Sequence, residues 1–157
     1  DAINYGVTGP SGRGSGWACD VRKRSPYAAY DKVQFDEVLY NEGDSYARYM
    51  VRMKEIEQSL HILEQLVDNI PEGDYLAKTK PIIKVPEGRY FKEVEAARGA
   101  FGIYLESRGD KFPYRLKVNS PGFNLVGAVD HMTRGSKIAD LIAIGGSLDY
   151  VVPDIDR

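Results

Sequence analysis

The most regular hydrophobic pattern in the chain lies between Asp44 and Ile70. Large apolar residues recur there at alternating spacings of three and four positions: Tyr46, Tyr49, Met53, Ile56, Leu60, Leu63, Val67 and Ile70. This spacing places them along one face of an α-helix, and Asp44 is a residue type that caps helix N-termini. Pro71 and Gly73 end the pattern, so we expect a helix about 40 Å long.

A helix of that length crosses the whole width of a domain of this size, whose expected radius of gyration is about 15 Å. Its apolar stripe needs a continuous apolar partner, because each fully buried large side chain contributes about 1.5–3 kcal/mol. The sequence contains no second helical pattern of matching length. We therefore expect part of the partner surface to lie outside this chain.

After this helix the hydrophobic pattern changes to the alternation that is typical of β-strands. Residues 90–95 predict one strand, and residues 38–40 predict a shorter one nearer the N-terminus. A hairpin with a loop longer than two residues is expected around residues 107–110, because apolar side chains alternate on both sides of that turn. Those side chains are Phe101, Ile103 and Leu105 before the turn, and Tyr114, Leu116 and Val118 after it.

Two shorter helices are expected near the C-terminus, over residues 124–129 and 136–144. Ser136 is the expected N-cap of the second, and Gly145 and Gly146 are expected to stop it. The glycine-rich residues 6–16 predict tight turns and close backbone approach in place of a helix or strand. Together these elements predict an α+β fold in a single domain, residues 1–157.

Composition narrows the classes of partner. The chain has 157 residues, 43% hydrophobic and 28% charged, with a formal net charge of -2, so no overall positive field favours nucleic acid or anionic lipid. A single cysteine, Cys19, excludes an internal disulfide framework and suits a reducing compartment. No stretch approaches the roughly 20 apolar residues of a membrane span, and the first residues do not form a signal peptide, which predicts a mature or excised start.

The glycine-rich segment does not match known nucleotide-binding motifs. A phosphate-binding P-loop ends in lysine followed by serine or threonine, whereas Gly14 is followed by Ser15. The dinucleotide fingerprint needs two residues between its second and third glycines, whereas Gly12, Gly14 and Gly16 alternate singly. We therefore interpret the segment as a tightly packed loop in which Arg13 is held in an ion pair.

Other candidates for chemistry have simpler structural interpretations. His61 pairs with Glu57 on the solvated face of the long helix, and His131 has no second ligand at helical spacing. Cys19 is expected to be a buried structural thiol, because no adjacent base is evident. The basic residues 22–24 are followed by enough acidic residues to favour a local ion-pair network over nucleic-acid binding.

The C-terminal tail, residues 147–157, interleaves acidic and apolar residues. The acids are Asp149, Asp154 and Asp156, and the apolar residues are Leu148, Tyr150, Val151, Val152 and Ile155. A frayed terminus seldom carries this many side chains to bury. We therefore expect the tail to fold inward and pack.

Taken in order, short motifs along the whole chain resemble the D subunit of complex I, the 49-kDa subunit in mitochondria. In the N-terminal half these are Gly6-Val7-Thr8-Gly9-Pro10, Arg13-Gly14-Ser15-Gly16, Asp20-Val21-Arg22-Lys23, Pro26-Tyr27, Gly43-Asp44, Arg48, Arg52, Glu55, Gln58-Ser59 and Pro71-Glu72-Gly73. In the C-terminal half they are Glu95-Ala96, Arg98-Gly99, Pro113-Tyr114-Arg115, Ser120-Pro121-Gly122-Phe123, Ala139-Asp140, Gly146-Ser147-Leu148-Asp149 and Asp156-Arg157. Each motif alone is weak, but jointly they are specific.

The resemblance implies a fold like that of the large subunit of nickel–iron hydrogenases. That fold is a long-helix bundle with a small antiparallel β-hairpin or sheet, and this chain is expected to hold only part of it. Hydrogenase relatives bind nickel through cysteine pairs, whereas residues 147–157 contain no cysteine. The resemblance therefore implies no nickel–iron chemistry here, and a pocket that binds the quinone headgroup in its place.

By the same resemblance, Asp149 and Val151 match positions that line this quinone pocket. Arg13 and Arg157 match family positions near the former metal site, with a less defined role. The histidine and tyrosine that contact the quinone carbonyls belong to the family's N-terminal half, so this chain is expected to supply part of a site. We expect no catalytic residue and no metal ligand in the chain itself.

The implied function is that of one component of an NADH:quinone oxidoreductase, in the quinone-reduction site and the peripheral-arm interface. The expected partners are other complex I subunits, above all the one that carries the terminal iron–sulfur cluster. NADH and the iron–sulfur clusters are expected in partner subunits, quinone is the substrate, and this chain is expected to bind no cofactor. The expected location is peripheral, on the cytoplasmic face of the inner (plasma) membrane, with membrane contact only through partners.

Two alternatives stay open from the sequence. One is the same role in a related membrane-bound complex with another electron donor, such as ferredoxin. The other is a non-catalytic scaffold domain. Two departures from the family pattern also stand out: Ser11-Gly12 replaces bulkier residues, and residues 74–89 form a shorter segment than in many relatives.

Overall fold

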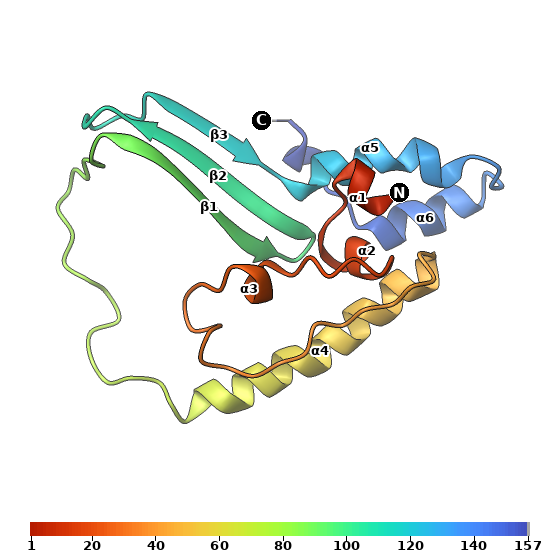
Figure 1. The fold of residues 1–157 in the computed structure, drawn as a ribbon, viewed down its shortest axis with the longest axis horizontal. Helices are drawn as coiled ribbons and strands as arrows, with labels where there is room; N and C mark the ends of the chain where they lie inside the picture. Colours follow the sequence, from red (N-terminus) through yellow and green to blue (C-terminus); the bar gives the residue numbers. More distant parts are fainter. Residues whose placement is uncertain (157) are drawn as a thin grey trace.

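The computed structural model describes residues 1–156 and has a mixed α+β architecture, as predicted (Figure 1). Three short helices come first: α1 (Ala2–Tyr5), α2 (Gly9–Arg13) and α3 (Val21–Arg24). The long helix α4 (Ser45–Val67) and the strands β1 (Gly88–Ala96), β2 (Gly99–Ser107) and β3 (Arg115–Asn119) follow. The chain then forms α5 (Pro121–Thr133), α6 (Asp140–Leu148) and a 3-10 turn, η1 (Val152–Asp154).

The three strands form one antiparallel sheet in the order β1-β2-β3. The turn between β1 and β2 is tight, because Ala96 pairs with Gly99 and only residues 97 and 98 lie between them. The connection from β2 to β3 is longer, and Glu106 pairs with Arg115 at its base. Both the predicted strand over residues 90–95 and the predicted hairpin are therefore confirmed.

Helix α4 begins as predicted, because the Asp44 carboxylate accepts a hydrogen bond from the Ala47 N–H at 2.7 Å. It ends at Val67, three residues before the predicted end at Ile70. The eight apolar side chains of the predicted stripe are 42% to 73% exposed. The helix packs on the rest of the chain through a different face, which includes Ala47, Arg48, Val51 and Ile62. Among residues 1–156 the stripe is thus largely uncovered, and that part of its partner surface lies outside this chain stays a prediction.

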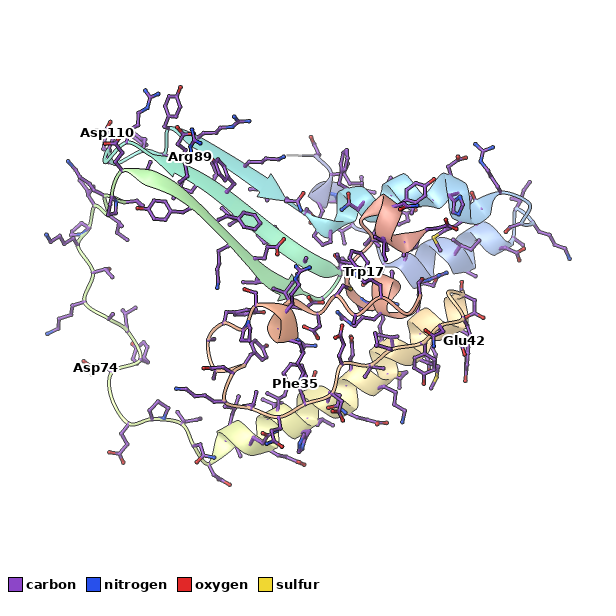
Figure 2. All side chains as sticks on the ribbon, viewed as in Figure 1. Trp17, Phe35, Glu42, Asp74, Arg89 and Asp110 are labelled. Atoms are coloured by element: carbon purple, nitrogen blue, oxygen red, sulfur yellow. The ribbon has the colours of Figure 1, made fainter. Side chains whose placement is uncertain are left out.

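The buried apolar side chains form two small cores. The first joins the N-terminal segment to α5 and α6, and it consists of Val7, Leu125, Ala128 and Leu148. The second joins the segment before α4 to the middle of that helix, through Val33, Phe35 and Ile62. Figure 2 shows Phe35 beside α4, whereas Asp74 lies on the long connection between α4 and β1. Each core anchors an N-terminal segment to a helix that comes later in the chain.

Several local predictions were wrong. Residues 9–13 form a short helix, because Pro10 suits the first turn of a helix and the Gly14 N–H bonds to the Pro10 carbonyl at 2.8 Å. Residues 38–40 run along α4 without strand pairing, and the Tyr40 N–H bonds to the Arg13 carbonyl at 3.0 Å. This N–H is therefore bound to the glycine-rich segment and is not available to pair with a neighbouring strand.

The C-terminal helices also differ from their predicted ends. Helix α5 is longer than predicted, because the Ser120 hydroxyl accepts from the Gly122 N–H and Pro121 occupies the first turn. Helix α6 begins at Asp140, so Ser136 is not its N-cap, and it continues through Gly145 and Gly146 to Leu148. The almost completely buried side chain of Leu148 accounts for this extension, because its packing outweighs the low helix propensity of the two glycines.

Candidate functional site

Arg13 is one of the few charged side chains that lie almost completely inside the described part of the protein. Its side chain is 2% exposed, and its guanidinium donates from Nε to Glu55 Oε1 at 2.6 Å and from Nη1 to Glu95 Oε1 at 2.7 Å. These two carboxylates stand on α4 and β1, so a single side chain joins α2 to both. The predicted ion pair of Arg13 is confirmed, and its partners are 42 and 82 positions away.

The electrostatics of this buried group favour its charged form. Burial works against the charge on Arg13, but Glu55 and Glu95 outweigh it and raise the pKa of Arg13 above its ordinary value. Burial also raises the pKa of Glu95, and Arg13 and the Val21 N–H limit that rise. Since Glu95 Oε2 accepts the Val21 N–H at 2.9 Å, the carboxylate is held by α3 as well as α2. Arg13 is thus a structural crosslink at the centre of the fold.

Asp149 lies at the end of α6, where the chain leaves the helix in the left-handed conformation (φ 56°, ψ 40°). Arg98, in the tight β1–β2 turn, donates from Nε to the Asp149 carbonyl at 2.8 Å. The same guanidinium donates from Nη2 to the Asp149 carboxylate at 3.3 Å. The turn between two strands and the start of the tail are therefore held together.

Arg52 connects these two parts of the site. Burial lowers the pKa of Arg52, the negative charges of Asp149 and Glu55 oppose this effect, and the positive charges of Arg98 and Arg13 add to it. Its guanidinium donates to the Arg48 carbonyl at 2.9 Å, one turn back along α4. The arginine cluster, as we call Arg13, Arg52 and Arg98 with Glu55, Glu95 and Asp149, therefore brings the predicted site residues Arg13 and Asp149 within electrostatic range of the same side chain.

The tail folds back onto the protein, as predicted. Val151 is half-buried, and its carbonyl lies beside Gly122 in the first turn of α5. A Cβ added to Gly122 would lie 3.0 Å from the Asp154 Cβ, so the tail and helix touch closely. The predicted site residue Arg157 lies outside the described residues.

Four members of the arginine cluster were not predicted as site residues from the sequence: Arg52, Arg98, Glu55 and Glu95. Arg98 stood within a recognised Arg-Gly motif, but its partner Asp149 is 51 positions away. Arg52 and Glu55 on the long helix, and Glu95 in the Glu-Ala motif, also belonged to motifs of the family resemblance, but none of them was given a role. The available signal was the charge of these residues, since a charged side chain at a position that packs against the rest of the chain needs a partner.

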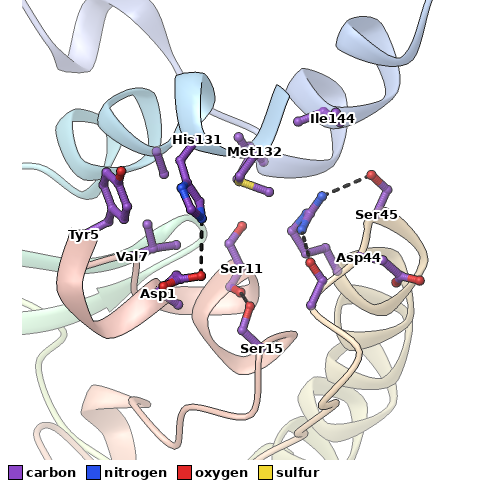
Figure 3. Close-up of a pocket in the computed structure, with 15 residues that line it drawn as sticks. Asp1, Tyr5, Val7, Ser11, Ser15, Asp44, Ser45, His131, Met132 and Ile144 are labelled. Atoms are coloured by element: carbon purple, nitrogen blue, oxygen red, sulfur yellow. Dashed lines mark hydrogen bonds and ion pairs between the residues drawn. The ribbon is translucent and has the colours of Figure 1, made fainter. Parts of the chain in front are cut away.

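A separate cavity of about 490 Å³ lies between α1, α2, α5, α6 and the start of α4 (Figure 3). Arg13, Asp149 and Val151 do not line it. Its polar end contains Arg48, which is 2% exposed and donates to the Ser45 and Ser147 hydroxyls and the Gly43 carbonyl. Burial lowers the pKa of Arg48. On the other side His131 lies 3.3 Å from an Asp1 carboxylate oxygen.

The remaining candidates from the sequence have structural roles. Cys19 is completely buried, and burial raises the pKa of its thiol to about 11. His61 approaches Glu64 at 3.9 Å, so the predicted pairing with Glu57 was wrong, because Glu57 is bound by Lys54 at 3.0 Å.

The basic segment forms the predicted local ion pairs, since Arg22 binds Asp20 at 2.7 Å and Arg24 binds Glu93 at 2.9 Å. Within residues 1–156, no three or more His, Cys, Asp or Glu side chains gather as metal ligands would. The same part of the chain contains no helix with the length and apolar character of a membrane span.

The fold and site define a mixed α+β protein whose charged centre ties its C-terminal tail to a glycine-rich N-terminal segment. Residues 1–84 and 78–157 match the family described as the respiratory-chain NADH dehydrogenase, 49 Kd subunit, and the chain belongs to this family.

Curated relatives agree with this assignment. The chain is 68% identical over 157 residues to the C/D subunit of the NADH-quinone oxidoreductase of Bacteroides fragilis, and 66% identical over the same length to that of Phocaeicola vulgatus. It covers 30% of the length of each. It is 56% identical over 154 residues to the D subunit of the NADH-quinone oxidoreductase of Desulfotalea psychrophila, which corresponds to 98% of this chain and 41% of that relative. The chain thus spans less than half the length of these relatives.

Proposed function

We propose that this chain forms part of the quinone-reduction site of an NADH:quinone oxidoreductase, with residues 149–151 as one wall of the quinone pocket. The observation that carries the proposal is the inward course of the tail, which Arg98 holds beside the glycine-rich segment. The relatives support quinone reduction with electrons from NADH as the reaction, since each of them is named as a subunit of an NADH-quinone oxidoreductase.

The chemistry of this wall suits a quinone headgroup. Small-molecule sites combine a mostly apolar lining with a few fixed polar groups. Tyr150 and Val151 are half-buried and supply apolar surface, and Asp149 supplies one carboxylate whose orientation is set by Arg98. In this role Asp149 orients the headgroup or tunes the potential around it. Arg13 does not contact the quinone in this proposal, because its guanidinium is bound to Glu55 and Glu95 inside the protein. Its contribution is to hold together the elements that carry the pocket.

The chain acts in this proposal together with partner subunits. Electrons from NADH reach quinone through iron–sulfur clusters held by partners, the nearest of them by the subunit that carries the terminal cluster. The uncovered stripe of α4 supports a second part of the proposal, a peripheral-arm interface, because eight large apolar side chains along one helix require cover. The proposed location is peripheral, on the cytoplasmic face of the membrane and in contact with it only through partners.

The experiment that tests the pocket uses the intact membrane-bound complex with two substitutions, Asp149→Asn and Val151→Phe. We expect each to lower quinone reduction at a given quinone concentration by roughly tenfold, while NADH oxidation by ferricyanide stays unchanged. The matched controls are Val152→Phe, whose side chain is 64% exposed, and Asp110→Asn, at the far end of the sheet (Figure 2). Wild-type quinone kinetics in both site variants would refute the pocket.

A further inference from the structure

The placement of Asp149 depends on a contact from a distant part of the chain. Asp149 has a left-handed backbone (φ 56°), which is uncommon for a residue with a side chain, although aspartate tolerates it better than most. Its own N–H bonds to the Gly145 carbonyl at 3.2 Å, which ends α6. Two groups of Asp149 then remain to be held. The contact to its carbonyl sets the direction in which the tail leaves the helix, and the contact to its carboxylate sets where that side chain points.

Arg98 holds both. Its Nε donates to the Asp149 carbonyl at 2.8 Å, and its Nη2 donates to Asp149 Oδ1 at 3.3 Å. Because a guanidinium is planar, two donors from one plane fix orientation as well as distance. The side chains of Arg98 and Asp149 are 33% and 42% exposed, so the charge attraction between them is screened and contributes little to stability. The contact is better suited to orienting Asp149 than to stabilising the fold.

The turn that carries Arg98 is itself held in place. The Thr8 hydroxyl accepts from the Ala100 N–H at 2.9 Å. Gly99 has φ 137°, and a Cβ added there would lie 2.4 Å from Thr8 Oγ1. A Cβ added to Gly9 would lie 2.5 Å from the Gly99 Cα. Two glycines thus let the backbones touch, and Arg98 extends from a base that cannot move without displacing the glycine-rich segment.

We propose that Arg98 is a positioning residue for quinone binding, which sets the direction of the Asp149 carboxylate and the course of the chain into Val151. This inference rests on the proposed quinone pocket. Arg98 acts through Asp149 and not on the quinone itself. Its removal should therefore change how well quinone binds more than the rate of reduction at saturation.

The test compares Arg98→Gln, Arg98→Lys, Asp149→Asn and the double variant Arg98→Gln/Asp149→Asn in the intact membrane-bound complex. A short-chain benzoquinone and a short-chain naphthoquinone serve as substrates, and KM and kcat are measured separately. NADH oxidation by ferricyanide reports assembly independently of quinone. Arg134→Gln is the matched control, because Arg134 pairs with Asp130 one helical turn away and both side chains are 75% exposed.

We expect Arg98→Gln to raise the quinone KM by roughly tenfold with less than about a twofold change in kcat. Arg98→Lys should give a smaller rise, because one ammonium keeps the charge but does not reproduce the planar pair of donors. The double variant should be less impaired than the sum of the two single effects, since both substitutions act on the same carboxylate, while the bond from Arg98 to the Asp149 carbonyl is lost only with Arg98. Arg134→Gln should match the wild type.

Three results would overturn the inference. If Asp149→Asn raises KM but Arg98→Gln does not, Arg98 positions nothing and the quinone pocket still stands. If the two single variants act additively, Arg98 works independently of Asp149. If both Arg98 variants lose ferricyanide activity in proportion to quinone activity, Arg98 is required only for assembly. Wild-type kinetics in both Arg98→Gln and Asp149→Asn would instead refute the quinone pocket on which the inference rests.

Discussion

The buried ion pairs of Arg13 give the sharpest prediction about stability. Arg13→Met keeps most of the side-chain volume but leaves the Glu95 carboxylate, which is 5% exposed, without its cation. Breaking a buried ion pair from one side costs about 3–5 kcal/mol, because the remaining charge stays desolvated. Arg13 also limits the rise in the pKa of Glu95, so this pKa should rise further in the variant.

Hydrogen exchange in the purified complex can measure this cost locally. The Val21 N–H is a direct reporter, because it donates to Glu95 Oε2 at 2.9 Å. Each 1.36 kcal/mol is a factor of ten, so 3–5 kcal/mol corresponds to a loss of protection of roughly 100- to 5000-fold for amides that exchange when this region opens. Adding Glu95→Gln should recover part of the loss, since it removes the unpaired charge. A loss below about tenfold, or a double variant less protected than Arg13→Met, would refute the reasoning.

Two further predictions concern α4 and the thiol. Leu60→Lys places a charge in the uncovered stripe, so it should strongly reduce the fraction of the subunit that migrates with the complex on native gels. The control His61→Lys lies off the stripe and should assemble normally. Equal assembly of the two variants would mean that the stripe is not an interface. At pH 8, Cys19 in the folded protein should be alkylated at least about 100-fold more slowly than after denaturation. The thiolate is the reactive form, and a pKa of about 11 in the folded chain leaves about 100-fold less thiolate than a pKa of 9 in the unfolded chain. Mass spectrometry measures the alkylation, and comparable rates before and after denaturation would show that Cys19 is accessible.

The same shift predicts a pH dependence with a definite sign. The folded chain keeps the Cys19 proton up to about pH 11, whereas the unfolded chain releases it near pH 9. Between these values the unfolded state therefore binds fewer protons, and stability falls as the pH rises. Cys19→Ala should lack this part of the alkaline loss, which can be measured from the hydrogen-exchange protection of the neighbouring amides.

The uncovered stripe of α4 shows how a sequence pattern can predict an element correctly without identifying what covers it. The spacing correctly predicted a long helix capped by Asp44. Within residues 1–156, however, the helix packs through Ala47, Val51 and Ile62, and the regular stripe faces away from the chain. Apolar periodicity reports that a face will be covered, but it does not say by which polypeptide. The relation to hydrogenase-like bundles also stays a prediction, because the helices that would complete such a bundle are not part of this chain.

The sequence by itself determined the elements whose causes are local. The long helix, the hairpin and the capping by Asp44 follow from backbone geometry and from side chains a few positions apart, and these can be identified along the chain. The inward tail could also be expected, because the apolar side chains of residues 148–155 need cover.

Only the tertiary structure decided how the charges pair. Arg13 binds partners 42 and 82 positions away, and Arg98 binds Asp149 across 51 positions. Which of many acidic residues a buried guanidinium meets depends on where the chain crosses itself. That crossing is set here by the close contact of Gly9 with Gly99, which no local pattern encodes. Short-range geometry thus formed the elements of this protein, and long-range packing formed its site.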